Sequence, residues 1–179
     1  MKTAFTALRA AVFGAGFIFL WGWIALALHY RYDSAIGFTL AGWARGLGIA
    51  AMIAGGILAF ACVATFVARG EGTPAPFDPP RKFVASGPYQ FVRNPMYIGG
   101  FTVLFGFGLY EQSPAILLFT LPWLLLAHLF VIVYEEPHLR ATFGTEYEAY
   151  CGSVRRWLPL RVSTRNSHVA TQHTVESSR

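Results

Sequence analysis

The stretch RKFVASGPYQFVRNPMYIGG, residues 81–100, is basic, rich in glycine and proline, and lies between long apolar segments. Within it, Asn94 is a favourable N-cap, and Pro95 suits the first helical position, where a missing N–H removes no hydrogen bond. The sequence is apolar from Met96 to Leu109, so we expect a membrane helix to begin at Pro95. Its first turn would present unpaired amides and the positive end of the helix dipole, which attract anions.

The composition outside this stretch is that of a protein embedded in a membrane. Of 179 residues, 55% are hydrophobic and 13% are charged, whereas soluble domains carry about 25% charged residues. The apolar runs predict an all-α membrane protein with about four transmembrane helices, the last two forming a helical hairpin. The predicted spans are residues 10–28, 46–68, 95–109 and 115–134. The two cysteines and five histidines show no metal-ligand spacing, so we expect no metal site.

The chain after the last span predicts short interfacial helices and then a tail. Pro137 and Gly144 divide this region into two candidate helices, residues 136–143 and 146–151. Residues 161–179 are polar without periodicity, which predicts disorder. We therefore expect one membrane domain, residues 1–160, followed by a disordered tail.

The basic residues predict the orientation of the protein in the membrane. With four spans, all of the 14 lysines and arginines except Arg31 and Arg45 fall on one side. The positive-inside rule makes that side cytoplasmic and places both termini there. We therefore expect an integral protein of a bacterial-type inner membrane. The net charge of +5 is explained by this topology, and we expect no nucleic-acid partner.

The cytoplasmic side would bring together several groups that can bind a charged small molecule. Tyr89 and Tyr97 flank the helix start at Asn94, and the acidic pair Glu135-Glu136 ends the last span. These groups match the needs of S-adenosylmethionine, whose carboxylate seeks amide donors, whose ammonium seeks a carboxylate and whose sulfonium favours an aromatic face. A nucleotide or a lipid headgroup would use the same groups.

His128 is an ionisable residue inside the fourth predicted span. Ionisable groups at such a depth are candidates for function. The alternative interpretation is a hydrogen bond to a neighbouring helix, and this is the interpretation that we favour.

Five short motifs connect these groups to a known family. They are Ser86-Gly-Pro-Tyr89, Arg93-Asn-Pro-Met-Tyr97-Ile-Gly99, Glu135-Glu136, Phe143-Gly-Thr-Glu-Tyr147-Glu-Ala-Tyr150 and Arg156-Trp-Leu-Pro159. In this order, over roughly residues 70 to 160, the sequence resembles the isoprenylcysteine carboxyl methyltransferase and phospholipid methyltransferase superfamily of integral-membrane enzymes.

The resemblance implies a methyltransferase that depends on S-adenosylmethionine. It implies a cofactor site between the helix start and the carboxylates after the last span. The residues expected to bind the cofactor are Arg81, Lys82, Phe83, Val84, Tyr89, Arg93, Asn94, Pro95, Met96, Tyr97, Glu135 and Glu136. No catalytic residue is assigned, because methyl transfer from a sulfonium mainly requires positioning and exclusion of water.

The sequence departs from the family pattern at two positions. Asn94 stands where the family usually has histidine, and Val131 stands where the isoprenylcysteine enzymes have an arginine that meets the substrate carboxylate. The methyl acceptor therefore stays open among an isoprenylcysteine-like carboxylate, a phospholipid amine and a small thiol. The alternative to an enzyme is a membrane scaffold or a transporter-like protein, although the spans contain few of the polar residues that line transport paths.

Overall fold

The computed structural model describes residues 2–38, 40–70 and 83–159. Two predicted cofactor residues, Arg81 and Lys82, and the predicted disordered tail lie outside the described residues. Every regular element within the described ranges is a helix, in agreement with the predicted all-α membrane protein.

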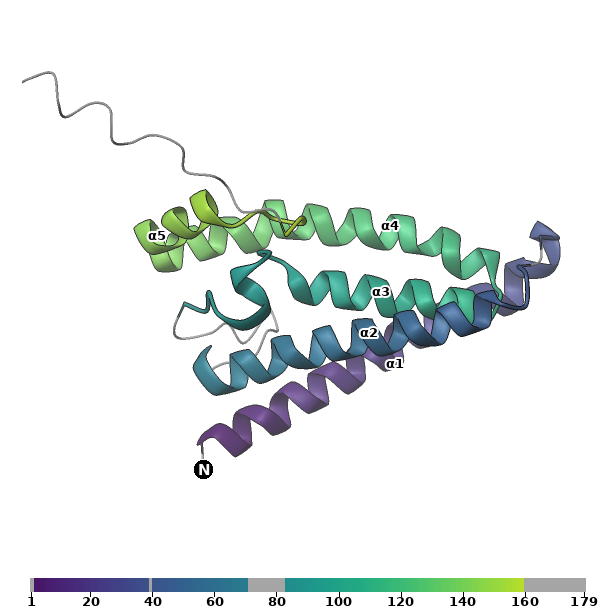
Figure 1. The fold of residues 1–179 in the computed structure, drawn as a ribbon, viewed down its shortest axis with the longest axis horizontal. Coiled ribbons are helices and arrows are strands. Elements are labelled where there is room, and N and C mark those ends of the chain that lie inside the picture. Colours follow the sequence, from purple (N-terminus) through teal and green to yellow (C-terminus); the bar gives the residue numbers. More distant parts are fainter. Residues whose placement is uncertain (1, 39, 71–82, 160–179) are drawn as a thin grey trace, which may run out of the picture.

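Four long helices run in alternating directions, so that the start of α3 and the end of α4 lie at the same end of the bundle (Figure 1). They are α1 (Lys2–Ile36), α2 (Ala44–Thr65), α3 (Pro95–Tyr110) and α4 (Pro114–Phe130), followed by α5 (Glu136–Ser153). The short elements are two π-helical turns, η1 (Phe66–Gly70) and η3 (Val131–Glu135), and a 3-10 turn, η2 (Gly87–Gln90). The N-terminus, the end of α2, the start of α3 and α5 share one end of the bundle (Figure 1).

Within the described ranges, three helical segments are long and apolar enough to cross a membrane, and α3 is a shorter apolar helix beside them. The three segments are Ala7–Ile36, Ala44–Arg69 and Pro114–Ser153. The last of these is longer than a bilayer requires, because about 20 helical residues cross the hydrocarbon. Counted from Pro114, its membrane-spanning part ends near Tyr134.

The first span is longer than the sequence predicted. We expected a helix over residues 10–28 and a loop from His29, but α1 continues to Ile36. The polar residues of the expected loop are satisfied on the helix, because His29 and Asp33 pair at 2.6 Å in an i,i+4 arrangement. The helix ends where Gly37 takes φ +66° and its N–H bonds the carbonyl of Asp33 at 3.2 Å.

The region after α4 also differs from the prediction of separate short helices. The π-helical turn η3 connects α4 directly to α5, and the N–H of Glu136 bonds the carbonyl of Val131. A widened turn at this point accommodates Pro137, which has no N–H to give to a regular helix. The predicted division at Gly144 is present as a kink within α5, where Gly144 takes φ 50° and ψ −125°.

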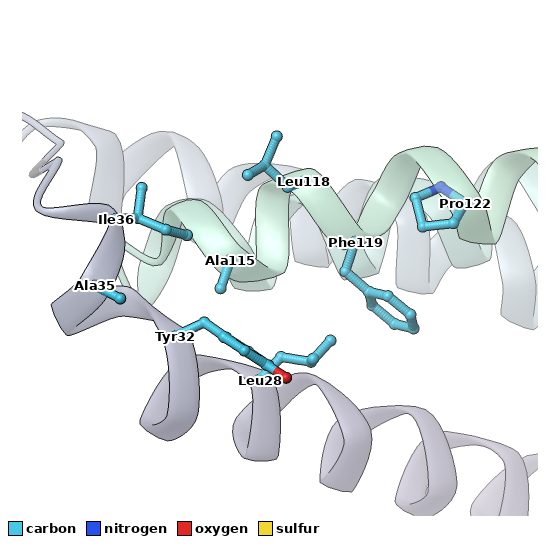
Figure 2. A pocket seen from close by; sticks show the side chains of 8 residues that line it. All are labelled: Leu28, Tyr32, Ala35, Ile36, Ala115, Leu118, Phe119 and Pro122. Atoms are coloured by element: carbon cyan, nitrogen blue, oxygen red, sulfur yellow. The ribbon is translucent and has the colours of Figure 1, made fainter.

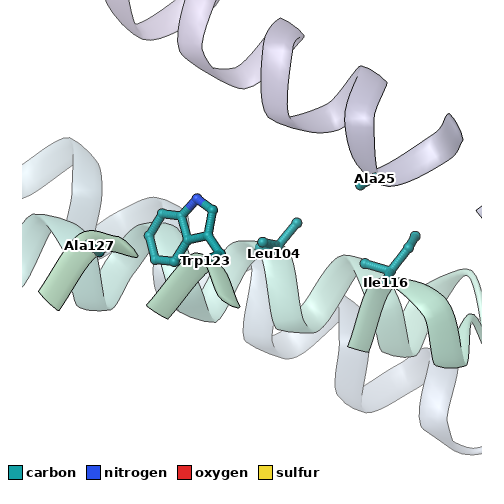
Figure 3. Packing of buried hydrophobic residues seen from close by; sticks show 5 residues of the cluster. All are labelled: Ala25, Leu104, Ile116, Trp123 and Ala127. Atoms are coloured by element: carbon teal, nitrogen blue, oxygen red, sulfur yellow. The ribbon is translucent and has the colours of Figure 1, made fainter. Parts of the chain in front are cut away.

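Close backbone contact holds α2 against α3. A Cβ added at Gly48 would lie 2.5 Å from the carbonyl oxygen of Gly106, and one at Gly55 would lie 2.6 Å from that of Gly99. These distances exclude any side chain, so the two helices approach as closely as small residues allow. A second cluster joins α1, α3 and α4 through Ala25, Leu104, Ile116, Trp123 and Ala127 (Figure 3).

An open apolar hollow of about 430 Å³ lies between α1 and α4 (Figure 2). Its lining residues are Leu28, Tyr32, Ala35, Ile36, Ala115, Leu118, Phe119 and Pro122. The hollow lies at the end of α1 and the start of α4, opposite the end of the bundle that carries Asn94 and the acidic pair. Its walls offer a charged ligand almost no polar partners, so we look for the functional site elsewhere.

Candidate cofactor site

The helix start at Asn94-Pro95 is buried but not capped by its own side chain. Pro95 begins α3 as predicted, and Asn94 occupies the N-cap position with 6% of its surface exposed. The Asn94 side chain makes no cap hydrogen bond, and its Nδ2 instead donates to the carbonyl of Arg156 at 3.3 Å. Asn94 was therefore predicted correctly as the N-cap position and wrongly as the capping group. No side chain among the described residues caps the amides of Met96 and Tyr97.

The acidic pair meets this helix start directly. The hydroxyl of Tyr97 donates to Oε2 of Glu135 at 2.9 Å. The sequence predicted that two segments separated by about one fifth of the chain share one site, and this contact, between residues 38 apart, brings them together. Glu135 remains partly exposed, so its carboxylate can meet a ligand as well as Tyr97.

Glu136 has a different environment from Glu135. It is 3% exposed, and its two oxygens accept from Arg156 Nε at 2.6 Å and Arg156 Nη2 at 3.0 Å. Arg93 Nη1 lies 3.3 Å and Arg140 Nη1 3.6 Å from the same carboxylate. Burial alone would raise the pKa of Glu136, but the hydrogen bonds from Arg156 and the charges of the three arginines outweigh it and hold the pKa below its usual value. Glu136 is thus engaged within the protein.

A short segment after α5 crosses the start of α3. We call residues 154–157 the C-terminal strap. The N–H of Arg93 donates to the carbonyl of Arg155 at 2.9 Å, next to the bond from Asn94 to Arg156. The bidentate pair between Arg156 and Glu136 fixes the strap to the start of α5. Arg156 and Trp157 belong to one of the family motifs but were not predicted as site residues.

Trp157 connects the strap to both helices of the hairpin. Its indole Nε1 donates to His128 Nδ1 at 3.0 Å, and its ring lies edge-on to Tyr97 with 6.4 Å between ring centroids. The predicted hydrogen bond of His128 therefore exists, but its partner belongs to the strap and not to a neighbouring helix.

The remaining predicted residues form the packed side of the site. Tyr89 is 8% exposed, packs with Val84 and Met96, and accepts at its carbonyl from the Tyr150 hydroxyl at 2.6 Å. Phe83 packs among Phe143, Tyr147 and Tyr150. These contacts hold the chain before α3 against α5.

Arg93 lies between the helix start and α5. Its Nη1 donates to Cys151 Sγ at 2.7 Å and faces Glu136. Its Nε is buried and has no hydrogen-bond partner among the described residues. A buried guanidinium N–H without an acceptor is costly, and an anionic ligand group would satisfy it.

A family model described as phospholipid methyltransferase matches residues 43–146. The chain belongs to the phospholipid methyltransferase family. This match covers more than half of the sequence and confirms the predicted resemblance. No curated protein and no solved structure matches the chain significantly.

The family match assigns methyl transfer to the protein as a whole. It includes α2, the helix start at Asn94 and both glutamates, and it ends before the C-terminal strap. The protein is accordingly a membrane methyltransferase of the phospholipid methyltransferase family, with a polar, partly buried site where α3 begins and α4 ends.

Proposed function

We propose that the protein transfers the methyl group of S-adenosylmethionine to the amine of a membrane phospholipid. The observation that carries this proposal is the hydrogen bond between Tyr97 and Glu135 beside the uncapped start of α3. Unpaired amides, an aromatic ring and a partly exposed carboxylate lie there within the reach of one small molecule.

The groups of this site fit the charges of the cofactor. The amides of Met96 and Tyr97, together with Nε of Arg93, would hold its carboxylate. Glu135 would hold the ammonium or the ribose hydroxyls, and the Tyr97 ring would face the sulfonium. Asn94, Pro95 and Tyr89 would keep this arrangement rigid. The bound cofactor supplies an electrophilic methyl group.

The residues of the chain act by positioning the two reactants and excluding water. The acceptor ammonium would first release a proton to water, which frees the nitrogen lone pair. The nitrogen would then form a bond to the methyl carbon as the carbon–sulfur bond breaks and its electron pair stays on sulfur. No covalent attachment to the protein is needed, and no nucleophilic side chain is assigned. We place this site on the cytoplasmic side, because the end of the bundle that contains it also carries most of the basic residues that the structure describes.

The amine is the acceptor class that the site supports best. A carboxylate acceptor would need a cation to hold it, but Val131 stands at the relevant position and is 0% exposed. Among the described residues beside the site, Arg156 is paired with Glu136, and Arg93, which also faces Glu136, is assigned above to the cofactor carboxylate. An amine needs no such cation, and the family match points to phospholipids.

Glu135→Ala tests the cofactor site. We expect binding of S-adenosylmethionine, measured by calorimetry on detergent-solubilised protein, to weaken by about 10- to 100-fold, because a charge-assisted hydrogen bond is lost. Glu146→Ala is the matched control, since Glu146 is exposed on α5. Equal affinities of the two variants, with both folded by circular dichroism, would contradict the assignment.

The acceptor is tested with radiolabelled methyl donor and three amphiphiles in mixed micelles. We expect label to enter phosphatidylethanolamine and neither a farnesylcysteine carboxylate nor a small thiol. Label in either of the other two acceptors would show that the phospholipid amine is not the acceptor and would assign the labelled compound in its place. A protein that binds no cofactor at all would support the scaffold alternative.

A further inference from the structure

The α3–α4 hairpin opens towards the end that carries the candidate site. Near its turn, a Cβ at Gly108 would lie 2.8 Å from Leu117 Cδ2, so the helices touch closely there. One at Gly100 would lie 3.3 Å from the end of the Trp123 ring, which fills a wider space. Near the site, the long side chains of Tyr97 and Glu135 meet only at their tips.

Trp157 lies in this opening. It comes from the C-terminal strap and contacts Tyr97 of α3 and His128 of α4. Helices of a hairpin do not need a third segment between them, and the strap is fixed independently by Arg156 and Asn94. The indole thus forms a separate wall on the membrane side of Glu135.

The contact with Trp157 fixes the proton of His128. An indole N–H can only donate, so Nδ1 of His128 must accept, and the neutral ring carries its proton on Nε2. Within the described residues no partner accepts from this Nε2–H, and the His128 side chain is half-buried. A donor at this depth in a membrane requires an acceptor.

We propose that His128 and Trp157 form the bilayer-facing wall of the methyl-acceptor site. In this arrangement Nε2–H of His128 donates to an ester oxygen of the bound phospholipid, and the indole borders its headgroup. This inference rests on the proposed function, and it names the residues that bind the second substrate.

The spacing along α4 supports this assignment. His128 precedes Glu135 by seven residues, which corresponds to about 10 Å along a helix. The distance from the amine to the ester oxygens of an extended phospholipid headgroup is of the same order. A lipid that presents its amine beside Tyr97 and Glu135 would therefore place an ester oxygen at the depth of His128.

The first test measures binding without turnover. Purified protein is exchanged into detergent containing phosphatidylethanolamine, and the retained lipid is measured by native mass spectrometry. We expect Trp157→Ala to retain at least about threefold less lipid than wild type, since it loses both the indole contact and the fixed orientation of His128. Trp23→Phe is the control, because Trp23 is 63% exposed on α1. Wild-type protein that retains no lipid, or equal retention by Trp157→Ala, would overturn the inference.

The second test uses variants that change one interaction each. Trp157→Phe keeps an aromatic ring and removes the indole N–H, whereas His128→Asn keeps an acceptor for that N–H and removes the ring with its Nε2–H. For both variants we expect KM for phosphatidylethanolamine to rise by about threefold to tenfold. KM for S-adenosylmethionine and the unfolding temperature should change little.

A rise of both KM values together, or no change in either, would show that the pair only supports the fold. Failure of the proposed function has a different signature: wild-type protein would then bind no S-adenosylmethionine by calorimetry, whatever its retention of phospholipid.

Discussion

The first residues of α3 and of α4 have the same kind of sequence, a polar residue followed by proline. The first amides of the two helices nevertheless have different hydrogen-bond partners. Ser113-Pro114 begins α4, and Ser113 Oγ accepts from the amide of Ile116 at 3.1 Å. Asp33 of α1 accepts from the amide of Ala115 at 2.9 Å. Asn94-Pro95 begins α3, yet the Asn94 side chain donates to the strap, and no side chain within the described ranges caps the first amides of this helix.

This difference separates a structural helix start from a candidate binding site. At the α4 start, donors are matched by acceptors from the protein, and α1 is fixed to the α3–α4 turn. At the α3 start, the Asn94 side chain leaves the amides of Met96 and Tyr97 uncapped, and we propose that a ligand uses them. A cap motif in the sequence therefore indicates where a helix begins. Whether the cap side chain bonds the helix amides distinguishes a structural helix start from a candidate binding site.

The largest expected effect is on stability and concerns Glu136, whose ion pair with Arg156 fixes the strap against the start of α3. Glu136→Gln would leave Arg156 and Arg93 near a neutral, buried group. We expect the free energy of unfolding to fall by about 3–5 kcal/mol, which is typical for breaking a buried ion pair from one side. Thermal unfolding in detergent would measure it, with Glu148→Gln as control, because the Glu148 side chain is 57% exposed. Similar stability of both variants would show that the strap is not fixed by this cluster.

The next effects concern the capping of the two helix starts, which is removed at α4 by one substitution and added at α3 by another. Ser113→Ala should lower the free energy of unfolding by about 1 kcal/mol, the usual cost of a lost cap, and leave cofactor affinity unchanged. Asn94→Ser should give α3 a capping group like that of α4, so that it competes with the cofactor carboxylate for the same amides. We expect Asn94→Ser to weaken S-adenosylmethionine binding several-fold in calorimetry. Tighter binding by this variant would reverse the comparison.

The smallest effect concerns pH. The pKa of Glu136 is lowered in the folded protein, so its ion cluster contributes stability above the unfolded-state pKa of about 4.5. This contribution is lost as the pH falls from that value through the folded-state pKa. We expect wild-type protein to lose more stability than Glu136→Gln between neutral and acidic pH. Parallel pH profiles of unfolding temperature would contradict the role of this carboxylate.

The sequence predicted those features that depend on local patterns. Apolar runs and proline positions located α2, α3 and α4, placed the start of α3 at Pro95, and began the fourth span one residue after the observed start of α4 at Pro114. The family motifs brought Tyr97 and Glu135 into one site, and the structure joins these residues by a hydrogen bond. Their binding of a cofactor is a prediction that the experiments above would test.

The features that were not predicted depend on partners far away in the chain. The extent of α1 was missed because the Asp33 carboxylate accepts a hydrogen bond from the amide of Ala115, which lies 82 residues later in the chain. The use of Asn94 was missed because its partner, Arg156, lies 62 residues away. Local propensity assigns an asparagine before a proline to a cap, and only the tertiary fold supplies a competing acceptor.

The glycine contacts between α2 and α3 have a consequence for how substrates exchange. Gly55 and Gly99 bring the two backbones so close that neither helix can slide or rotate without a steric clash. Under the proposed function, the cofactor would therefore be held beside a rigid pair of helices. We then expect a lipid to enter, and its methylated product to leave, by displacement of α4 and the segment that follows it, with α2 and α3 stationary.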